Sequence, residues 1–352
     1  MANRPNIRKG SSKFKLFLKV TLLITLSLAI SASAYGVYLT KKAEHTANIA
    51  FEEIEDRKTP EKRQVKVEPA TDNVSILFLG VDDSEKRGQG AEHSRTDALL
   101  LATLNNKTKT VKLLSIPRDS YVYIPYISDN DKINHAHAFG GTLATIETVE
   151  ELFNIPIDYY FRLNFEAFID VVDALGGIEA DVPYKLVELD EFDKRTINLE
   201  PGLQQLNGSE ALALARTRKL DSDIERGKRQ QEIIKAIASK AASFSSITKY
   251  DDLLEAVGNN MKTDMSFSEM KSFFSYLTDG MPRIDTLTLT GYDDMSTGTY
   301  YYKLDKEALD ETQHILQSHL GLIPDSTDVS STDSSSNSEQ TQTENNSLNI
   351  AE

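Results

Sequence analysis

The sequence predicts an α/β fold, an α-β-α sandwich with a central mixed β-sheet, preceded by one N-terminal transmembrane helix. Segments with strand character alternate with segments of helical periodicity, which is the pattern of a sheet covered by helices on both faces. The strand candidates are continuous apolar runs, as expected for strands buried on both faces. A chain of 352 residues with 39% hydrophobic residues can bury one large core and still carry extensions.

The N-terminus has the pattern of a membrane signal-anchor. Residues 1–19 are basic and hold no acidic side chain, and an uncharged run follows at residues 20–39. Twenty helical residues rise about 30 Å, the thickness of a bilayer core, so we expect a transmembrane helix over residues 20–40. The basic flank predicts a cytoplasmic N-terminus and an extracellular remainder. A cleaved signal peptide is the alternative, because residues 31–34 read SASA, but the apolar run is longer than the usual signal core.

Two polar segments flank the expected domain at residues 71–322. Residues 41–70 mix charges of both signs and contain two prolines, so we expect a partly helical, solvated extracellular stalk. Residues 323–352 have few apolar and no basic side chains. Such a segment cannot bury enough surface to fold, which predicts a disordered, polar and acidic tail.

Within the domain, apolar and β-branched runs predict six strands, at residues 74–80, 98–104, 111–117, 157–163, 178–182 and 284–290. Apolar residues at helical spacing predict seven helices, at residues 142–153, 165–175, 209–215, 223–242, 250–261, 266–278 and 306–319.

Composition excludes several classes of function. The chain has no cysteine, so it cannot form disulfides, thiolate metal sites or a cysteine nucleophile. Its formal net charge of −15 argues against general nucleic-acid binding, which requires a basic field. No serine-hydrolase pattern of the GxSxG type stands out.

The segment RTRKLDSDIERGKRQQ, residues 216–231, concentrates arginine in this acidic chain. Ser222 and Glu225 form a capping-box pattern, so a helix is expected to begin at Asp223. The N-terminus of such a helix offers unpaired N–H groups and a partial positive charge, which together attract anions. Arg229 points to another side of this helix and is ranked lower.

Four side chains of this segment are expected to converge on an anion. Arg226 and Gln230 share the face of the helix that Asp223 begins. Arg216 and Arg218 lie two residues apart in the preceding extended chain and point the same way. Guanidinium forks suit phosphate best, so the segment predicts a phosphate pocket. A solvated face of arginines paired with neighbouring acids is the alternative.

Three further charged clusters lie at the ends of predicted strands, where α/β sheets place their ligands. Asp82 follows the first strand, Arg95 and Asp97 precede the second, and Arg118 follows the third. Asp82 and Asp97 can supply oxygen ligands to Mg²⁺, which takes few carboxylates and leaves room for phosphates. Mn²⁺ suits the same ligands. With arginines to neutralise phosphate oxygens, the clusters predict a metal-assisted phosphate site.

In this order the motifs resemble the LytR-CpsA-Psr family of cell-wall glycopolymer ligases. The resemblance covers about residues 74–300 and includes GVDD, SRTDALLL, SIPRDSYV, KINHAHAFGG, IDYYFRLNF, VVDALGG and GLQQLNGSEALALARTRKLDSDIERGKRQQ. The last block is the most specific, and the single N-terminal anchor also fits the family topology.

The resemblance implies an extracytoplasmic phosphotransferase of a Gram-positive bacterium. Such enzymes move a polyprenyl-pyrophosphate-linked polymer (teichoic acid, capsule or another wall polysaccharide) onto peptidoglycan as a phosphodiester. The acceptor is usually the 6-hydroxyl of N-acetylmuramic acid, and undecaprenyl phosphate leaves. The implied partners are this lipid-linked polymer, peptidoglycan and the membrane, with no nucleic acid.

The expected site residues fall into three groups. Asp82 and Asp97 hold Mg²⁺, with help from Asp223 through water. The catalytic group is Asp97, Arg118 and Asp223, and either Asp97 or Asp223 takes the proton of the acceptor hydroxyl. The pyrophosphate is gripped by Arg95, Arg118, Arg216, Arg218, Arg226 and Gln230.

A lipid substrate would also need an apolar groove between the sheet and the helices. The candidate wall residues are Leu99, Leu101, Phe165, Phe168, Val171 and Val172. For each of these residues we favour a place in a packed core over a lipid contact, because a large aliphatic core looks the same in sequence whether it is filled or hollow. His135 and His137 alternate as metal ligands on a strand would, but without further histidines nearby we expect a loop or acceptor-site contacts rather than zinc.

Two other functions are compatible with parts of this pattern. Water could replace the sugar hydroxyl, which would give a lipid-pyrophosphate hydrolase with the same metal and arginines. A membrane-bound transcriptional attenuator without catalysis is a third hypothesis. It is weakened because about nineteen cytoplasmic residues are too few to fold into a DNA-binding domain.

Overall fold

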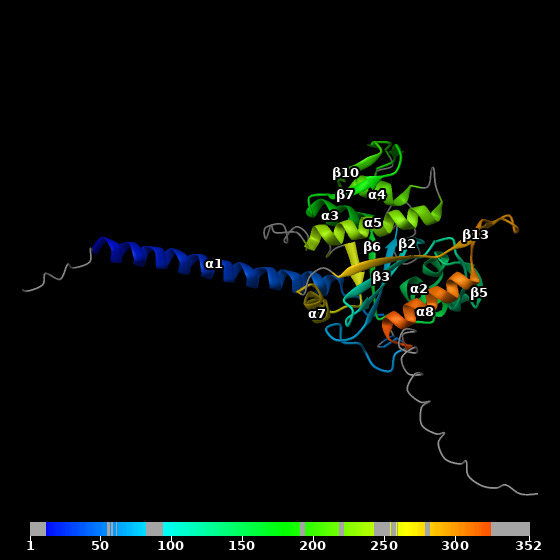
Figure 1. The fold of residues 1–352 in the computed structure, drawn as a ribbon, viewed down its shortest axis with the longest axis horizontal. Coiled ribbons are helices and arrows are strands. Elements are labelled where there is room, and N and C mark those ends of the chain that lie inside the picture. Colours follow the sequence, from blue (N-terminus) through cyan, green and yellow to red (C-terminus); the bar gives the residue numbers. More distant parts are fainter. Residues whose placement is uncertain are drawn as a thin grey trace, which may run out of the picture.

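The computed structural model describes residues 12–54, 57, 59–60, 62–81, 94–190, 194–217, 222–242, 254, 258, 260–278 and 282–324. Its centre is a six-stranded sheet in the order β11-β6-β1-β2-β3-β12 (Figure 1). The strands are β1 (Val74–Val81), β2 (Thr96–Asn105), β3 (Thr110–Ser115), β6 (Tyr159–Asn164), β11 (Met261–Thr263) and β12 (Arg283–Thr288). β1 runs parallel to β6 and β3 runs parallel to β12, whereas the other neighbours are antiparallel. The predicted mixed sheet is confirmed.

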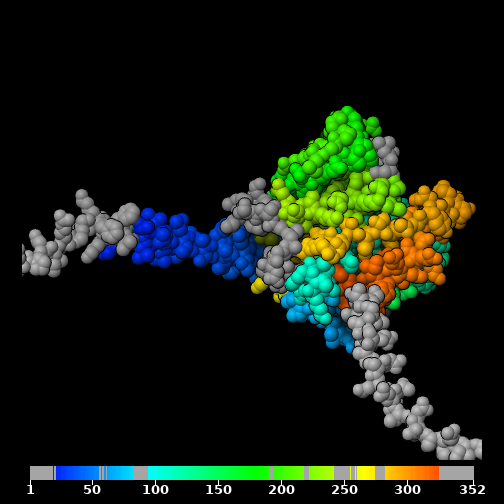
Figure 2. Space-filling view, in the orientation of Figure 1, coloured from blue at the N-terminus to red at the C-terminus, as the bar shows by residue number. Residues whose placement is uncertain are grey.

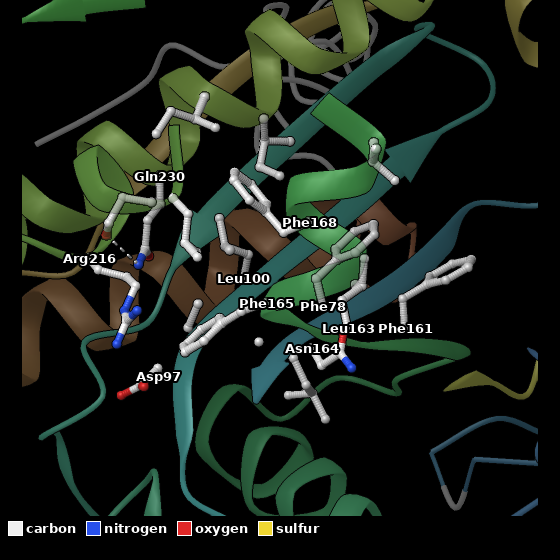
Figure 3. Close-up of a pocket in the computed structure, with 18 of the residues that line it drawn as sticks. Phe78, Asp97, Leu100, Phe161, Leu163, Asn164, Phe165, Phe168, Arg216 and Gln230 are labelled. Atoms are coloured by element: carbon white, nitrogen blue, oxygen red, sulfur yellow. Dashed lines mark hydrogen bonds between the residues drawn. The ribbon is translucent and has the colours of Figure 1, made fainter. Parts of the chain in front are cut away.

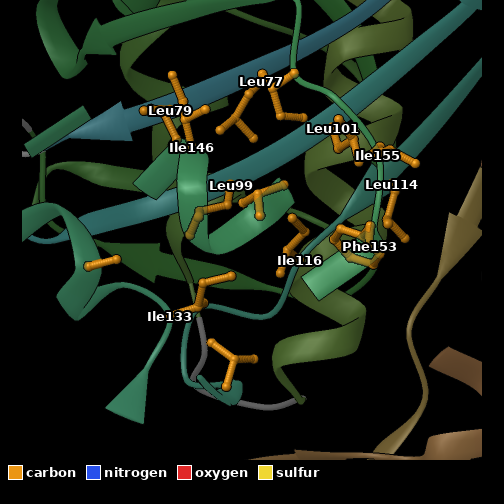
Figure 4. Packing of buried hydrophobic residues seen from close by; sticks show 14 of the residues in the cluster. Leu77, Leu79, Leu99, Leu101, Leu114, Ile116, Ile133, Ile146, Phe153 and Ile155 are labelled. Atoms are coloured by element: carbon orange, nitrogen blue, oxygen red, sulfur yellow. The ribbon is translucent and has the colours of Figure 1, made fainter. Parts of the chain in front are cut away.

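Helices cover both faces of this sheet, as predicted. One face carries α2 (His135–Phe153) and α8 (Lys306–Leu320), and the other carries α3 (Phe165–Ala174), α4 (Gly208–Arg216) and α5 (Asp223–Ala242). On the α2/α8 face, alternate strand residues such as Leu77, Leu99 and Leu101 form the main core (Figure 4). Successive strand residues point to opposite faces, so Leu100 and Leu113 face α5 and pack against Ile234.

Among the described residues, four short two-stranded sheets lie outside the central sheet, and of their strands the sequence analysis predicted only β7. They pair β4 (Tyr121–Ile124) with β5 (Asp129–Lys132), β7 (Ile178–Val182) with β10 (Gly202–Leu206), β8 (Leu186–Glu188) with β9 (Ile197–Leu199), and β13 (Gly291–Asp294) with β14 (Tyr301–Leu304). Strands this short do not show enough of the two-residue period to be recognised. The β13–β14 hairpin projects from the body of the domain (Figures 1 and 2).

The N-terminal helix α1 (Ser12–Ala50) has 39 residues and extends far beyond the domain (Figure 1). Its segment Thr21–Ala50 is long and apolar enough to cross a bilayer, and apolar side chains such as Leu22, Leu23 and Ile24 are exposed. A helix that presents apolar side chains all round is the form of a membrane anchor. Its last turn is buried at Ala47 and Ala50, where the helix meets the domain.

Residues after α1 bind the domain, so the expectation of a solvated stalk is wrong for them. Arg57 donates to Glu150 over 2.7 Å, and Arg63 donates to both carboxylate oxygens of Asp158 over 2.8 and 2.9 Å. The backbone N–H of Glu52 donates to Thr263 at the edge strand β11. Burial drives the pairing, because Asp158 and Glu150 lie against the core and each needs a cation.

Other predicted elements differ locally from the structure. The motif KINHAHAFGG is not a loop: β5 ends at Lys132 and α2 begins at His135, with non-helical dihedral angles at Gly140 and Gly141. Gly141 adopts φ 65°, which glycine permits without strain. The predicted helix at 250–261 lies mostly outside the described residues, and its last residue begins β11. Most of the predicted tail also lies outside them.

Candidate functional site

A cavity of about 620 Å³ lies between the sheet and the helices α3, α4 and α5 (Figure 3). A gap of this size is uncommon in a protein interior, which is packed as densely as an organic crystal. It lies on the sheet face opposite the main core. The space is large enough to hold a ligand.

The sheet forms an apolar floor. Phe78 on β1 lies directly opposite Leu100 on β2 and Phe161 on β6, so the three side chains share one face. The Phe78 and Phe161 rings are stacked, with centroids 5.5 Å apart. Further along the same rows, Gly80 lies opposite Ala98. Their small size keeps the end of the cavity next to Asp97 open.

Three helices form the walls with residues at helical spacing. α3 contributes Phe165, Phe168 and Val171, three of the candidate wall residues for which a core role was favoured from the sequence. From α4 and α5 the wall includes Leu212, Ile233, Ile234 and Ile237. The helix that begins at Asp223 therefore runs along one side of the cavity. Its first turns present Arg226 and Gln230 to the cavity, and its later turns present isoleucines.

The charged residues gather at one end, so the cavity is amphipathic. Asp97, Arg118, Arg216, Arg226 and Gln230 all line it. In Figure 3, Asp97, Arg216 and Gln230 lie together at one end, while Phe78, Phe161 and Leu163 lie at the other. Such a space fits a molecule with an anionic head and a long apolar body.

Ion pairs hold this charged end in place. The Arg118 guanidinium donates to Asp97, and Arg226 donates to Asp223 over 3.1 Å. Gln230 donates to the backbone oxygen of Ala215 over 3.3 Å and so ties α5 to α4. Because each pair leaves other guanidinium N–H groups available, the residues can bind an anion without releasing their partners.

Two arginines have unused buried donors. Within the described part of the chain, Nε of Arg118 and Nε of Arg226 are buried without a hydrogen-bond acceptor. A buried donor without a partner costs roughly 1–3 kcal/mol. Arg226 is only 4% exposed, and burial lowers its pKa even though Asp223 opposes the shift. An anion at this end of the cavity would satisfy both donors and offset the cost of burying the charges.

Arg216 is available to an anion for a different reason. Its guanidinium stacks on the Phe165 ring, 4.3 Å from the centroid. Among the described residues it makes no ion pair with a carboxylate. The ring fixes the plane of the guanidinium, and its N–H donors remain free to bind a ligand.

The pKa of Asp223 is raised. Burial is the largest cause, the nearby Asp119 carboxylate adds to it, and the guanidiniums of Arg226 and Arg118 oppose it. A carboxylate that binds a proton more readily than usual is better suited to act as a base. Asp223 does not line the cavity, whereas Asp97 lies in its wall.

The structure brings together five of the predicted site residues in the cavity wall and places Asp223 beside them. Arg95 is exposed and does not line the cavity. Asp82 and Arg218 lie outside the described residues. The roles assigned to all of these residues remain predictions. Arg229 is buried and donates to the backbone oxygens of Leu214 and Thr217, which agrees with its lower rank.

On the sheet side the prediction of a packed core is confirmed, since Leu99 and Leu101 belong to the main core on the opposite face. Leu100 lines the cavity instead and was not among the candidates. Val172 is also part of a packed core. The run ALLLATL is apolar at every position, so its sequence does not indicate which face is hollow.

Sequence reasoning assigned no role to two charged residues next to the site. Lys132 donates to Asp119 over 2.9 Å, and Asp119 lies 3.6 Å from Nε of Arg118. Asp119 directly follows Arg118 in the motif SIPRDS, which is the signal that could have identified it. Lys132 comes from the KINHAHAFGG motif, and only the β4–β5 pairing brings it to this place.

The described residues are compatible with a magnesium site that substrate phosphates would complete. Among the described residues, no three His, Asp or Glu side chains converge on one point. Mg²⁺ does not need three, because it takes one or two carboxylates together with phosphate oxygens and water. Asp97 lies in the cavity wall beside the arginines and offers one such carboxylate.

The fold and the cavity define an α/β protein with a candidate N-terminal membrane span and a cavity suited to an amphiphile with an anionic head. The chain belongs to the LytR_cpsA_psr family, whose model matches residues 37–318. This confirms the family resemblance noted from the motifs.

Relatives and solved structures agree with this assignment. The chain is 40% identical to the polyisoprenyl-teichoic acid–peptidoglycan teichoic acid transferase TagT of Bacillus subtilis over 324 residues, 92% of this chain and 100% of that one. A structure of TagT bound to LIIa-WTA matches with a TM-score of 0.66 and 39% identity, covering 77% of this chain and 99% of that one. TagT with bound octaprenyl pyrophosphate lipid matches with a TM-score of 0.62 and 36% identity, over 77% and 99%.

Proposed function

We propose that this protein transfers a glycopolymer from a polyprenyl pyrophosphate carrier onto peptidoglycan. The observation that carries the proposal is the amphipathic cavity, with three arginines at one end and aliphatic and aromatic walls along the rest. A related chain has been solved with octaprenyl pyrophosphate bound. The isoprenoid chain would occupy the apolar part, and the pyrophosphate would lie against Arg118, Arg216 and Arg226.

The anchor supports this orientation of the lipid. Met261, on the edge strand β11, lines the apolar part of the cavity. The same strand contacts the end of α1 through Phe51, which is bridged to Thr263. The lipid and the anchor helix would therefore reach the domain from the same side. We place the N-terminus in the cytoplasm and the domain outside the cell, because the basic segment precedes the apolar helix.

The reaction requires mainly positioning and charge neutralisation. The acceptor hydroxyl oxygen forms a bond to the phosphorus that carries the glycopolymer. The bond from this phosphorus to the bridging oxygen breaks, and its electron pair leaves with the polyprenyl phosphate. The products are a phosphodiester between polymer and peptidoglycan, and polyprenyl phosphate. The three arginines hold the negative charge that moves onto the leaving phosphate.

Asp223 is proposed to accept the hydroxyl proton. Its pKa is raised by burial, and it lies at the charged end of the cavity through its pair with Arg226. Asp97 is the better candidate for holding the metal, because it lines the cavity. Asp97 together with Asp82 would hold Mg²⁺, or Mn²⁺, and the ion would neutralise phosphate oxygens when bound.

The proposal is tested by reconstituting the full chain with a synthetic polyprenyl-pyrophosphate saccharide, Mg²⁺ and peptidoglycan. The expected product is a phosphosaccharide attached to the glycan, detected by mass spectrometry, and Asp97→Ala and Arg118→Ala should both abolish it. Release of saccharide phosphate with no adduct would favour a hydrolase. A lipid that is neither bound nor consumed would contradict the site assignment.

A further inference from the structure

We propose that a tyrosine- and lysine-rich ribbon next to the arginine end of the cavity binds the acceptor, an alternating chain of N-acetylated hexosamines. This inference rests on the proposed transferase function and names the place where its second substrate would bind. The ribbon consists of four short strands in the order β5-β4-β14-β13. β4 pairs with β5 and β13 pairs with β14.

Contacts between β4 and β14 join the two hairpins. Ser120, just before β4, is bridged to Tyr302 in β14. The backbone N–H of Tyr302 donates to the backbone oxygen of Asp119 over 2.9 Å. The ribbon is therefore attached directly to the segment that carries Arg118.

The outer face of the β4–β5 half follows from its pairing. In β4, Val122 and Ile124 are buried, so Tyr121 and Tyr123 point outward. Tyr121 lies directly opposite Lys132 of β5, and directly opposite residues share a face.

The β14–β13 half continues this face. In β14, Tyr302 is buried and Tyr301 and Lys303 point outward. Tyr292 of β13 lies opposite Lys303 and shares its side. The Tyr121 and Tyr301 rings meet edge to face, with centroids 4.8 Å apart, and Nζ of Lys303 lies 3.1 Å from the Tyr121 centroid. The two halves therefore form one continuous surface.

This surface has the chemistry of a carbohydrate platform. An aromatic ring can cover the C–H face of a pyranose, while its hydroxyl group and neighbouring ammonium groups can bind sugar oxygens. Tyr123 is 44% exposed and Tyr292 is 63% exposed, so much of each ring faces water. Two exposed and two half-buried tyrosines on one face form an aromatic patch of the kind that marks an interaction site. Lys132 and Lys303 add N–H donors that can bind hydroxyl and N-acetyl oxygens of the sugar chain.

The geometry of the reaction indicates that the ribbon binds the acceptor and not the polymer of the lipid-linked donor. The attacking and leaving oxygens lie roughly in line on opposite sides of the phosphorus. The lipid phosphate leaves on the cavity side, so the hydroxyl must arrive from the other side. Lys132 and Asp119 connect Arg118 to the ribbon and do not line the cavity. Asp223, the proposed base, is among the carboxylates that raise the pKa of Tyr300, the residue just before β14.

The experiment measures donor and acceptor separately in the full chain, with un-cross-linked peptidoglycan glycan chains as the acceptor. The variant is Tyr123→Ala combined with Tyr292→Ala, because both residues are exposed and their removal should leave the fold intact. We expect the KM for the glycan to rise by about tenfold or more, as for loss of two contact residues. The KM for the lipid donor and the affinity for octaprenyl pyrophosphate should stay within about twofold, since no cavity residue changes. Leu203→Ala is the matched control, since Leu203 is 68% exposed on β10, away from the ribbon.

Each other outcome has a definite meaning. An unchanged KM for the glycan overturns the inference, and a rise in the KM for the donor alone assigns the ribbon to the donor's polymer instead. If the wild-type protein makes no adduct, the transferase proposal fails. Calorimetric titration with the same glycan chains then tests the ribbon by itself, because binding that the double variant loses would still support it.

Discussion

Arg216 offers the cleanest test of anion binding in the cavity. It is half-buried, stacked on Phe165, and committed to no ion pair among the described residues. Replacing it by glutamine removes a charge that the folded protein uses only in stacking on Phe165, so the unfolding free energy should change by about 1 kcal/mol or less. A hydrogen bond to a charged group is worth about 1.5–3 kcal/mol, which corresponds to about 10- to 150-fold in affinity.

The assay is binding of octaprenyl pyrophosphate to the full chain in detergent, measured by calorimetry beside octaprenol, which has no phosphate. Arg216→Gln should weaken binding of the pyrophosphate by that factor and leave binding of the alcohol unchanged. Arg229→Gln provides the opposite pattern. Arg229 donates to the backbone oxygens of Leu214 and Thr217, so its loss should lower stability by about 2 kcal/mol or more. Equal weakening for both lipids, or no weakening for either, would refute the placement of the pyrophosphate.

Three further predictions concern the cavity, the stalk and the C-terminal helix. Ala98→Leu fills the open end of the cavity, so octaprenyl pyrophosphate should bind at least about tenfold more weakly. The melting temperature should stay the same or rise, because the larger side chain fills empty space. A lower melting temperature with unchanged binding would contradict a hollow site. Arg63→Ala leaves the buried Asp158 carboxylate without its cation and should cost about 3 kcal/mol in urea unfolding, whereas a solvated stalk predicts no loss. Burial lowers the pKa of His319 to about 4. Its neutral ring contributes stability above pH 6.5 that is lost as the pH falls toward 4, about 3 kcal/mol in all. His319→Gln should remove this part of the pH dependence, and an unchanged slope would contradict it.

The sequence predicted the sheet well because its strands are buried on both faces and read as uninterrupted apolar runs. For the same reason the sequence did not indicate which face of the sheet lines the cavity. In ALLLATL every residue is apolar, so nothing separated Leu100, which faces the hollow, from Leu99 and Leu101, which pack in the core. A cavity depends on what the opposing helices leave unfilled, and that is set by packing between distant segments.

The charged end of the site was more predictable than its surroundings. Charges at strand ends and on one face of a helix identified Asp97, Arg118, Arg226 and Gln230 from local spacing alone. Lys132 could not be found in this way, because it reaches Asp119 only through the pairing of β4 with β5. The tyrosine ribbon likewise requires two hairpins from separate parts of the chain to meet at one bridge.

The central claim is that a sugar hydroxyl, and not water, attacks the polymer-bearing phosphorus while the lipid phosphate leaves. The most direct test is a single turnover of the full chain with lipid-linked saccharide and peptidoglycan in ¹⁸O-labelled water. The account predicts a glycan-linked phosphodiester without ¹⁸O and one polyprenyl phosphate released for each adduct. Saccharide phosphate that contains ¹⁸O, formed in place of the adduct, would contradict it and identify a hydrolase.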